Sequence, residues 1–321
     1  MRWRPSANLQ ILKARAALYA QIRAFFAQRN VLEVETPILN RSTASEPLLA
    51  SIGAQVRMHE QGGHEKLYLH TSPEYPMKRL LAAGAGAIFQ ICKTFRDGET
   101  GRRHNPEFTM LEWYRPGFAL HDLMGEVSDL LVGVLQCQPP QVSTYRQVFE
   151  QHVGIDPFTA SLRLLNEQAR KLAAYEGPEL ERDAALDLLM ACVIEPRLGL
   201  NAPLFVTEYP PTQASLARVI QDAQGQAVAA RFELYIQGVE LANAYWELCD
   251  ATEQRARFEQ DNLQRRAMGL PEIPLDEHLL AAMEAGLPEC SGVALGIDRL
   301  LMIQQGANSL EEVLAFPIER V

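Results

Sequence analysis

The sequence predicts an α+β fold in which an antiparallel β-sheet is flanked by helices. Strand-like segments gather at both ends of the 321-residue chain and a mainly helical stretch separates them, whereas regular alternation of strands and helices would favour a parallel sheet. Residues 231–236 alternate polar and apolar side chains, which indicates a strand. The chain contains neither a G-x-G-x-x-G fingerprint nor a G-x-x-x-x-G-K-[ST] loop, so the common parallel-sheet nucleotide-binding folds are not indicated.

Periodicity and turn residues place the elements in chain order. An amphipathic helix precedes a strand at 31–34 that Thr36-Pro37 ends, and its apolar stripe consists of Ile11, Leu18, Ile22, Phe25 and Phe26. Further strands are expected at 87–95, 108–114, 230–248 and 293–296, and helices at 162–175, 182–194, 251–268 and 297–305. We expect a single domain over residues 1–321, with a mainly helical insertion at about 139–228 that begins at Pro139-Pro140.

Composition excludes several classes of protein. Hydrophobic residues make up 47% and charged residues 22% of the chain, which is typical of a globular protein and excludes disordered, collagen-like and coiled-coil chains. No stretch approaches the ~20 apolar residues of a membrane span, and no signal-peptide pattern opens the chain. The five cysteines form no C-x-x-C pair and the histidines show no metal-ligand spacing. Neither a disulfide framework nor a zinc site is therefore expected, and a cytoplasmic location fits best.

The charge of the chain is acidic overall and uneven along its length. Forty acidic against thirty basic residues give a net charge of −10, which argues against a general nucleic-acid binder. No acidic residue precedes Glu33, although Arg15, Arg23 and other basic residues lie in that segment. This pattern fits a helix with a solvated basic face, a transit peptide, or a surface that docks an acidic partner. The apolar stripe of the helix argues against a transit peptide. The docking surface would combine the opening helix, including Arg15 and Arg23, with Arg102 and Arg103.

The segment from Phe95 to Tyr114 is the first that could carry chemistry. Two strand-like runs flank a ten-residue, highly charged loop at 97–106, and long ordered hairpin loops tend to be functional. Arg96, at the end of the first strand, could direct its guanidinium at a phosphate, and Phe108 could stack on a base. The alternative is a surface loop beside a core phenylalanine.

The second segment is a predicted hairpin that carries two carboxylates. Gln237-Gly238 fits a two-residue turn, which would place Tyr235 opposite Glu240 and pair Glu233 with Ala242. Glu233 and Glu240 would then be diagonal neighbours on one face. Two such carboxylates, together with phosphate oxygens, are ligands that Mg²⁺ prefers. The alternative is a solvated polar face.

Glu247 joins these carboxylates only if the second strand of the hairpin is irregular. It lies seven residues after Glu240, so an unbroken strand would point it to the opposite face. A β-bulge near Asn243-Ala244 is therefore required for Glu247 to share the site.

The third segment, Ser291 to Arg299, joins a glycine-punctuated strand to a helix. Its glycines permit close approach of the backbone to a ligand, and Arg299 falls in the first helical turn, where it could meet a polyphosphate. The alternative is a tight turn with a surface arginine.

Together with Leu32–Pro37, these segments resemble the motifs of class II aminoacyl-tRNA synthetases, most closely the lysyl-tRNA synthetase group. Motif 1 corresponds to Leu32–Pro37, motif 2 to Phe95–Glu112 and motif 3 to Gly296–Arg299. The resemblance covers nearly the whole chain but leaves no room for the anticodon-binding domain that precedes motif 1 in lysyl-tRNA synthetases. Relatives that consist of the catalytic domain alone and share Glu240–Asn243 and Ser291–Gly296 are the elongation factor P–(R)-β-lysine ligases, and the chain looks like one of these.

This resemblance implies an ATP-dependent ligase that forms an amide bond. It would activate (R)-β-lysine or lysine as an aminoacyl adenylate and transfer it to a lysine side chain of elongation factor P, with Mg²⁺ as cofactor and as a homodimer built through motif 1. The catalytic residues it implies are Arg96 and Arg299. The ATP-binding residues it implies are Arg96, Asp97, Gly98, Asn105, Phe108, Glu240, Leu241, Gly296 and Arg299. The substrate-binding residues it implies are Ser72, Pro73, Glu74, Tyr114, Asn243, Glu247 and Ala294, and the metal ligands are Glu233 and Glu240.

Within the substrate set, Glu74 and Glu247 are implied to hold the two amino groups of the substrate. The chain departs from the family at motif 2, where Gly98 stands in place of a glutamate that contacts ATP. We expect Asp97, Glu99 or a backbone group to take its part.

Three alternative functions remain open from the sequence. A synthetase that charges tRNA with lysine is disfavoured by the missing anticodon domain and by the negative net charge. An amide synthetase of the same fold is disfavoured because two substrate-site glutamates suit a diamine. A non-catalytic amino-acid-binding regulator would usually lack the motif arginines, which are present here. Neither tRNA nor a membrane is expected as a partner.

Overall fold

The computed structural model describes residues 3–58 and 63–321. The chain divides into two compact units, one formed by residues 1–118 with 248–321 and the other by residues 119–247. The described residues include no helix with the length and apolar character needed to cross a bilayer.

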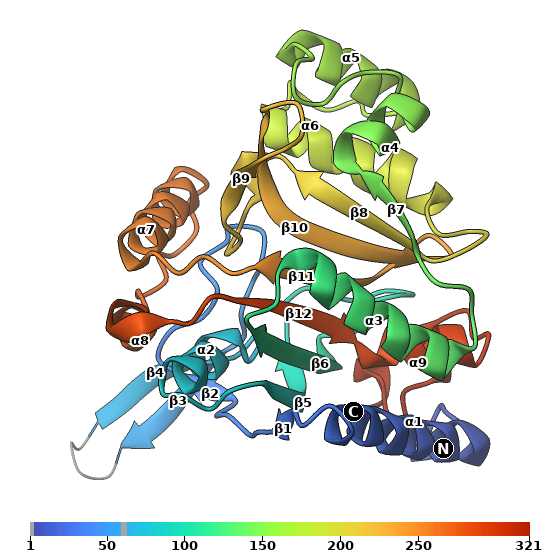
Figure 1. Ribbon diagram of the computed structural model, residues 1–321, viewed down its shortest axis with the longest axis vertical. Helices are drawn as coiled ribbons and strands as arrows, with labels where there is room; N and C mark the ends of the chain where they lie inside the picture. The colour runs from blue at the N-terminus through green and yellow to red at the C-terminus, as the bar shows by residue number, and fades with distance from the viewer. Residues whose placement is uncertain (1–2, 59–62) are drawn as a thin grey trace. The chain divides into compact units, whose positions relative to one another are not determined.

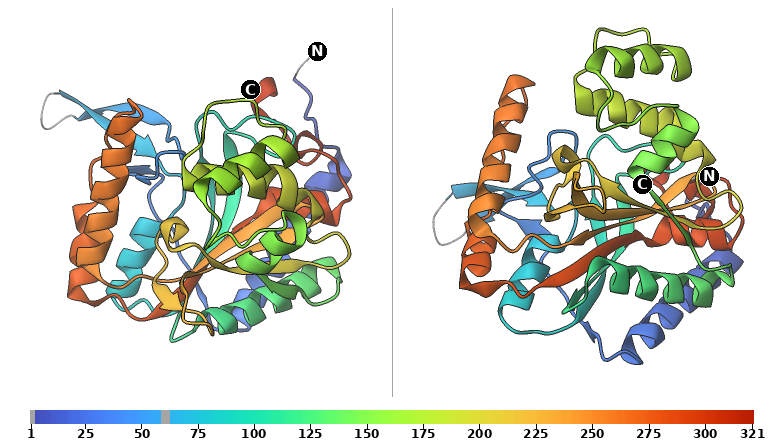
Figure 2. Two further views of the ribbon diagram at one scale, coloured as in Figure 1. Left: turned by 90° about the horizontal axis from the view of Figure 1, so that it is seen from above. Right: turned by 45° about the horizontal axis from the view of Figure 1, so that its top comes forward.

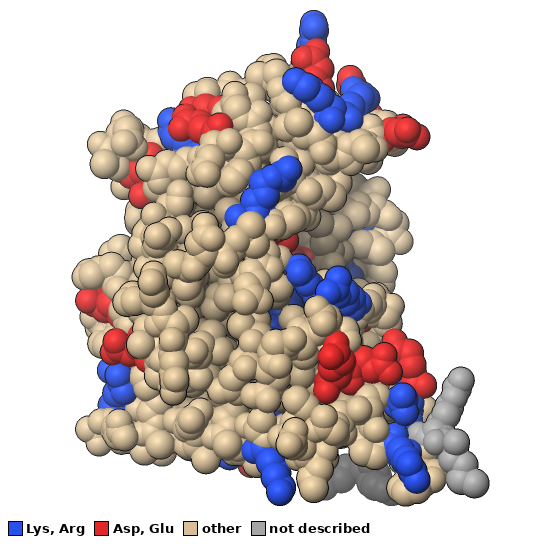
Figure 3. Space-filling view, turned by 90° about the vertical axis from the view of Figure 1, so that its right-hand side faces the viewer, with Lys and Arg blue, Asp and Glu red and all other residues tan. Residues whose placement is uncertain are grey.

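On the face that Figure 3 draws, basic and acidic side chains lie in small groups of both signs among other residues.

The first unit is built on a sheet in which the strands pair in the order β1-β5-β6-β12. β1 and β5 are parallel, whereas β5 and β6, and β6 and β12, are antiparallel. A small antiparallel sheet has the order β2-β4-β3. The strands of this unit are β1 (Leu32–Glu33), β2 (Leu39–Asn40), β3 (Gly53–Met58), β4 (Gly63–Leu69), β5 (Ile88–Phe95), β6 (Glu107–Pro116) and β12 (Cys290–Gly296).

The helices of the first unit are α1 (Leu9–Ala27), α2 (Glu74–Ala82), α7 (Ala251–Ala267), α8 (Glu277–Gly286) and α9 (Ile297–Gln304). Short 3₁₀ turns follow at Leu310–Glu312 and Ile318–Arg320. Helix α1, blue in Figure 1, contacts β1 and α9.

Helix α1 forms because its N-terminus is capped and one of its faces is apolar. The Asn8 side chain accepts a hydrogen bond from the backbone of Ile11, which satisfies one of the free donors at a helix start. Leu18, Ile22 and Phe26 are buried, and the Phe26 ring stacks on Phe89 of β5 with its centroid at 4.4 Å. Three residues of the predicted apolar stripe therefore belong to the core, whereas Ile11 and Phe25 are half-buried.

The second unit has its own sheet, with the order β11-β10-β8-β7 and with β9 paired to β10. β7 and β8 are parallel, and the other pairs are antiparallel. Its strands are β7 (Gln141–Thr144), β8 (Leu204–Tyr209), β9 (Val219–Gln221), β10 (Ala227–Ile236) and β11 (Val239–Trp246). Its helices are α3 (Leu120–Leu135), α4 (Tyr145–His152), α5 (Leu162–Leu172) and α6 (Arg182–Leu189), followed by a π-helical turn at Met190–Ile194 and 3₁₀ turns at Glu195–Arg197 and Pro211–Gln213.

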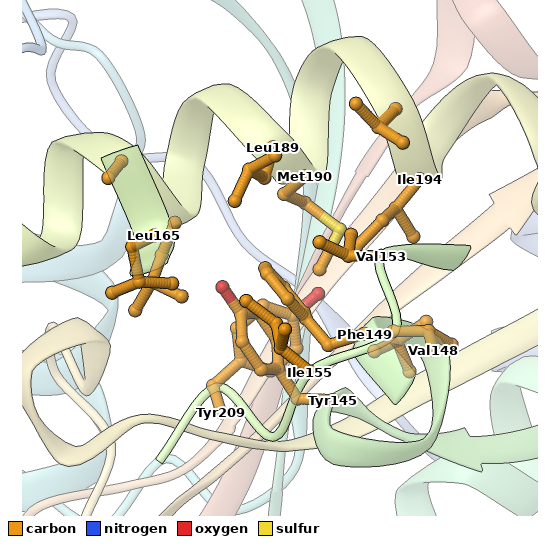
Figure 4. Packing of buried hydrophobic residues seen from close by; sticks show 14 of the residues in the cluster. Tyr145, Val148, Phe149, Val153, Ile155, Leu165, Leu189, Met190, Ile194 and Tyr209 are labelled. Carbon is orange, nitrogen blue, oxygen red and sulfur yellow. The ribbon is translucent and has the colours of Figure 1, made fainter. Parts of the chain in front are cut away.

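Helices α4, α5 and α6 gather on one side of β8 and β10, as Figures 1 and 2 show. Their apolar side chains form a core with the two strands, in which Tyr145 and Phe149 stack with centroids 4.6 Å apart. Figure 4 shows Leu165, Met190 and Tyr209 around these two rings. Burial of these large side chains stabilises the helical segment on the sheet.

The expected α+β organisation with predominantly antiparallel strand pairs is confirmed. Every strand and helix expected from periodicity is present within a few residues of its expected bounds. The period-two pattern at 231–236, however, does not mark a half-exposed strand, since Glu233 and Tyr235 on the polar side are 8% and 0% exposed. The alternative of a solvated polar face is therefore wrong for this strand.

Candidate active site

Arg96 follows directly after β5, at the start of the loop that leads to β6. Its backbone N–H donates to the carbonyl of Pro106 at 2.9 Å, which closes the base of the loop. Its guanidinium lies 5.1 Å from the centroid of the Phe108 ring, a distance typical of a cation–π contact. Arg96, expected to contact a phosphate, and Phe108, expected to stack on a base, are thus neighbours, and their contact restricts the side-chain conformations of both.

Glu99 is the acidic group of this loop that reaches Arg96. Its carboxylate lies 3.5 Å from Arg96 Nη1, whereas Asp97 is exposed and donates its backbone N–H to Ala50. Gly98 has φ = 76°, in the left-handed region that disfavours residues with a Cβ. A glycine suits this backbone conformation, and Glu99, which contacts Arg96, is the better candidate to replace the glutamate that the resemblance implies.

Asn105 and the segment beyond it anchor the far end of the loop. The Asn105 Nδ2 donates to the carbonyl of Glu107 at 2.6 Å, and its Oδ1 accepts from the backbone of Ile318 at 3.0 Å. Both ends of the amide are therefore used within the protein, and the residue is buried.

Arg299 reaches the same loop from the first turn of α9. Its Nη2 lies 2.9 Å from His104 Nε2, and its Nε donates to the carbonyl of Arg103 at 3.4 Å. Burial lowers the pKa of His104, and the charges of Arg299 and Arg96 lower it further. The structure thus brings the two predicted catalytic arginines to one loop, beside a histidine whose pKa is lowered.

Strand β12 presents two of the expected residues at partly exposed positions. Ala294 and Gly296 are half-buried, while the intervening and preceding residues of the strand are buried. Ala294 lies across from Glu112, and Gly296 across from Met110, in the β6–β12 register. The two expected residues therefore face the same side of the sheet.

A buried carboxylate, Glu112, links two of the residues expected to bind the substrate. The Ser72 hydroxyl donates to Glu112 Oε2 at 2.7 Å and the Tyr114 hydroxyl donates to Oε1 at 2.6 Å. Glu112 is 2% exposed. Sequence reasoning gave it no role, although a single acidic residue inside the apolar run Met110–Tyr114 was a signal that could have identified it.

Glu74 is held in place by the first turn of α2. Its backbone N–H donates to Ser72 Oγ at 3.0 Å, with Pro73 at the helix start. Its Oε1 accepts from Lys78 Nζ at 2.5 Å, and Lys78 is 1% exposed. Glu74 therefore forms an ion pair with a buried lysine that lies one helical turn later, which the sequence analysis did not anticipate.

The predicted hairpin of the second unit is present, but its register differs from the expected one. Tyr235 opposes Glu240 as predicted, but Glu233 opposes Asn243 instead of Ala242. The register shifts between Leu234 and Tyr235, so the extra residue on β11 is Leu241.

The bulge that Glu247 requires is therefore present, two residues before its expected position at Asn243-Ala244. Beyond it, Asn243, Tyr245 and Glu247 have the parity that places them on the face of Glu233 and Glu240. Glu247 is buried, and its carbonyl accepts from Arg218 Nε at 3.2 Å. The bulge at Leu241 thus places the side chains of the other expected hairpin residues on one face of the sheet. These residues are Glu233, Glu240, Asn243 and Glu247.

Glu233 is bound closely by its neighbours in this unit. Its Oε1 pairs with Arg231, and its Oε2 accepts hydrogen bonds from the hydroxyls of Tyr235 and, at 2.7 Å, Tyr209. Arg231 Nε also donates to Asn243 Oδ1 at 3.1 Å. Arg231 was not anticipated from the sequence, yet it holds two of the expected site residues.

These contacts bear on the expected Mg²⁺ site. Both oxygens of Glu233 already accept from a cation or from hydroxyls, so direct ligation would displace Arg231 or a tyrosine. No cluster of three or more His, Cys, Asp or Glu side chains that could hold a metal occurs among residues 3–58 and 63–321. A site that uses one carboxylate, Glu240, with substrate phosphate oxygens still fits the usual coordination of Mg²⁺.

Comparison with known proteins supports the resemblance. The chain matches the family model of class II tRNA synthetases (D, K and N) over residues 1–320. It is 51% identical to the elongation factor P–(R)-β-lysine ligases of Klebsiella pneumoniae and Salmonella paratyphi C, over 99% of this chain and 98% of each relative. The same identity and coverage hold for the protein of this name from Salmonella heidelberg. The chain therefore belongs to the class II tRNA synthetase family and is an ATP-dependent ligase of that family.

Proposed function

We propose that this enzyme activates (R)-β-lysine, or lysine, with ATP and transfers it to a lysine side chain of elongation factor P. The observation that carries the proposal is the 51% identity over 99% of the chain to ligases of that name. The site geometry supports it, because two arginines meet one loop and a buried carboxylate lies between two expected substrate residues.

In the first step, the substrate carboxylate oxygen attacks the α-phosphorus, the bond to the bridging oxygen breaks, and pyrophosphate leaves. Both reactants are anionic, so catalysis requires positioning and charge neutralisation more than a side-chain nucleophile. We assign Arg96 to the α-phosphate and Arg299 to the γ-phosphate. The Phe108 ring, which packs against Arg96, offers an apolar face to adenine.

Mg²⁺, when bound, would neutralise phosphate charge, and Glu240 is the residue that we expect to hold it. We assign Glu233 a positioning role because Arg231, Tyr209 and Tyr235 already occupy its oxygens. Leu241, as the bulge residue, sets the direction of Glu240 and Asn243 relative to each other.

We assign the substrate ammonium groups to buried or half-buried carboxylates. Glu112, fixed by Ser72 and Tyr114, joins Glu74 and Glu247 as a candidate partner, since a buried ammonium requires an anion or acceptor close by. Ala294, across from Glu112, shapes the adjacent wall.

In the second step, the neutral amine of a lysine on elongation factor P attacks the carbonyl carbon of the adenylate. The carbon–oxygen bond to phosphate breaks, AMP leaves, and the amine loses a proton to form the amide. We propose that the enzyme acts in the cytoplasm as a homodimer and as a single catalytic domain. An exposed row of small residues on α1, Ala16, Ala20, Ala24 and Ala27, beside motif 1 is compatible with a helix that meets a second copy.

The test is a labelling experiment with ATP and radioactive (R)-β-lysine or lysine, in which elongation factor P and tRNA are supplied separately. We expect the label on elongation factor P. Label on tRNA alone would replace this proposal by tRNA charging, and absence of adenylate formation with either isomer would reject lysine as the substrate class.

A further inference from the structure

Arg15, on helix α1 and outside the three motifs, makes contacts that are unusual for a residue of a basic surface. Its Nη1 lies 2.6 Å from Asp298 Oδ1, and its Nη2 donates to the carbonyl of Val313 at 3.0 Å. Its side chain is 15% exposed. The expectation that Arg15 docks an acidic partner is therefore wrong, because its charge is turned inward and paired. Arg23, the other residue expected there, pairs with Glu33 at the surface.

Asp298 connects Arg15 to the loop that carries the phosphate-binding arginine. Its side chain is 3% exposed, and its Oδ2 accepts the backbone N–H of Thr109 at 2.6 Å. Thr109 is the residue after Phe108 on β6, and Asp298 is the residue before Arg299 on α9. One carboxylate thus ties the start of α9 to the strand that carries the expected adenine-stacking ring.

The buried Asp298 carboxylate requires a positively charged partner to remain in this contact. A carboxylate that is almost completely removed from water loses its hydration, and the Arg15 guanidinium, 2.6 Å from Asp298 Oδ1, supplies the compensating charge. Without Arg15, the buried Asp298 carboxylate would lose its compensating charge and would move toward water. That movement would alter the first turn of α9, from which Arg299 reaches His104 and the Arg103 carbonyl.

We propose that Arg15 is a positioning residue for ATP binding, which acts through Asp298 on Arg299 and on the β6 strand beside Phe108. This inference rests on the ATP-binding role proposed above for Arg299. It explains why a basic residue lies in the opening helix at this point without facing solvent.

The test compares Arg15→Gln, Arg15→Lys, Asp298→Asn and the double variant Arg15→Gln/Asp298→Asn with the parent enzyme in lysine-dependent ATP–pyrophosphate exchange. Arg23→Gln is the matched control, since it removes a guanidinium from the same helix at a surface ion pair. Folding of each variant is checked by circular dichroism, and ATP affinity is measured by calorimetry well below the unfolding temperature.

We expect Arg15→Gln and Asp298→Asn each to raise the KM for ATP about tenfold, because a small misplacement of a catalytic group is costly. The KM for lysine should stay within about twofold, and the double variant should be no worse than the more severe single variant. Arg15→Lys, which keeps the charge but loses the forked geometry, should lie between Arg15→Gln and the parent enzyme. Arg23→Gln should match the parent enzyme.

An unchanged KM and affinity for ATP in folded Arg15→Gln or Asp298→Asn would overturn the inference. So would a double variant whose rise in the KM for ATP equals the product of the rises in the two single variants. If Arg15→Gln does not fold, Arg15→Lys and Asp298→Asn decide by the same criteria. A parent enzyme that forms no adenylate would instead refute the proposed function, so the two failures are distinguishable.

Discussion

Replacement of Glu112 by Gln is the sharpest test of the substrate site in the first unit. The substitution keeps the size and shape of the side chain and removes only its charge. Ser72 and Tyr114 donate to its two oxygens, and their hydroxyls can reorient toward the new amide. The packing of this buried position therefore changes little, and the main loss is the attraction for a substrate ammonium group.

The size of the effect follows from the chemistry of the contact. A hydrogen bond to a charged group contributes about 1.5–3 kcal/mol, and each 1.4 kcal/mol is about a factor of ten in an equilibrium constant. We therefore expect the KM for lysine or (R)-β-lysine to rise by roughly 10- to 150-fold. The KM for ATP should remain within about twofold.

The assay is amino-acid-dependent ATP–pyrophosphate exchange, with Glu107→Gln as the control. Glu107 lies on the same strand but is half exposed, where it pairs with Lys93 at 3.2 Å, and such surface pairs contribute little. Equal KM values for lysine in Glu112→Gln and Glu107→Gln would refute the reasoning.

Three further predictions concern catalysis, thiol chemistry and packing. Arg96→Ala should nearly abolish pyrophosphate exchange, because it removes the charge at the α-phosphate; exchange at the parent rate would exclude that role. Burial raises the pKa of the Cys92 thiol to about 12, so iodoacetamide at pH 8 should label the exposed Cys192 and spare Cys92; mass spectrometry that finds Cys92 labelled first would contradict this. Gly199→Ala should destabilise the protein by about 1–3 kcal/mol more than Gly225→Ala in urea unfolding. Both glycines have positive φ, but only at Gly199 would an added Cβ overlap the Tyr235 carbonyl, and equal losses would argue against that clash.

The hairpin of the second unit shows how far a sequence pattern can be carried. The turn at Gln237-Gly238 and the pairing of Tyr235 with Glu240 follow from local turn chemistry and were correctly predicted. The requirement for a bulge also followed, from the parity of Glu247. Its position at Leu241 could not be predicted, because it depends on how β10 packs between two neighbouring strands.

Arg15 and Glu112 show the opposite case, in which local sequence was uninformative or misleading. A basic residue in a segment without acids suggests a solvated face, but the nearest carboxylate in space, Asp298, is 283 residues away in the chain (298 minus 15). In the sequence, Glu112 is one acidic residue in a strand. Only the structure shows that the hydroxyls of Ser72 and Tyr114 donate to its two oxygens.

The sequence by itself determined the fold class and the family resemblance, because periodicity, turn residues and motif spacing are local properties of the chain, and the resemblance supplied most of the candidate site residues. Only the tertiary structure decided which charges are paired and which polar groups are buried. The physical reason is that the cost of burying a charge is met by partners brought close in space, and those partners lie far apart in sequence.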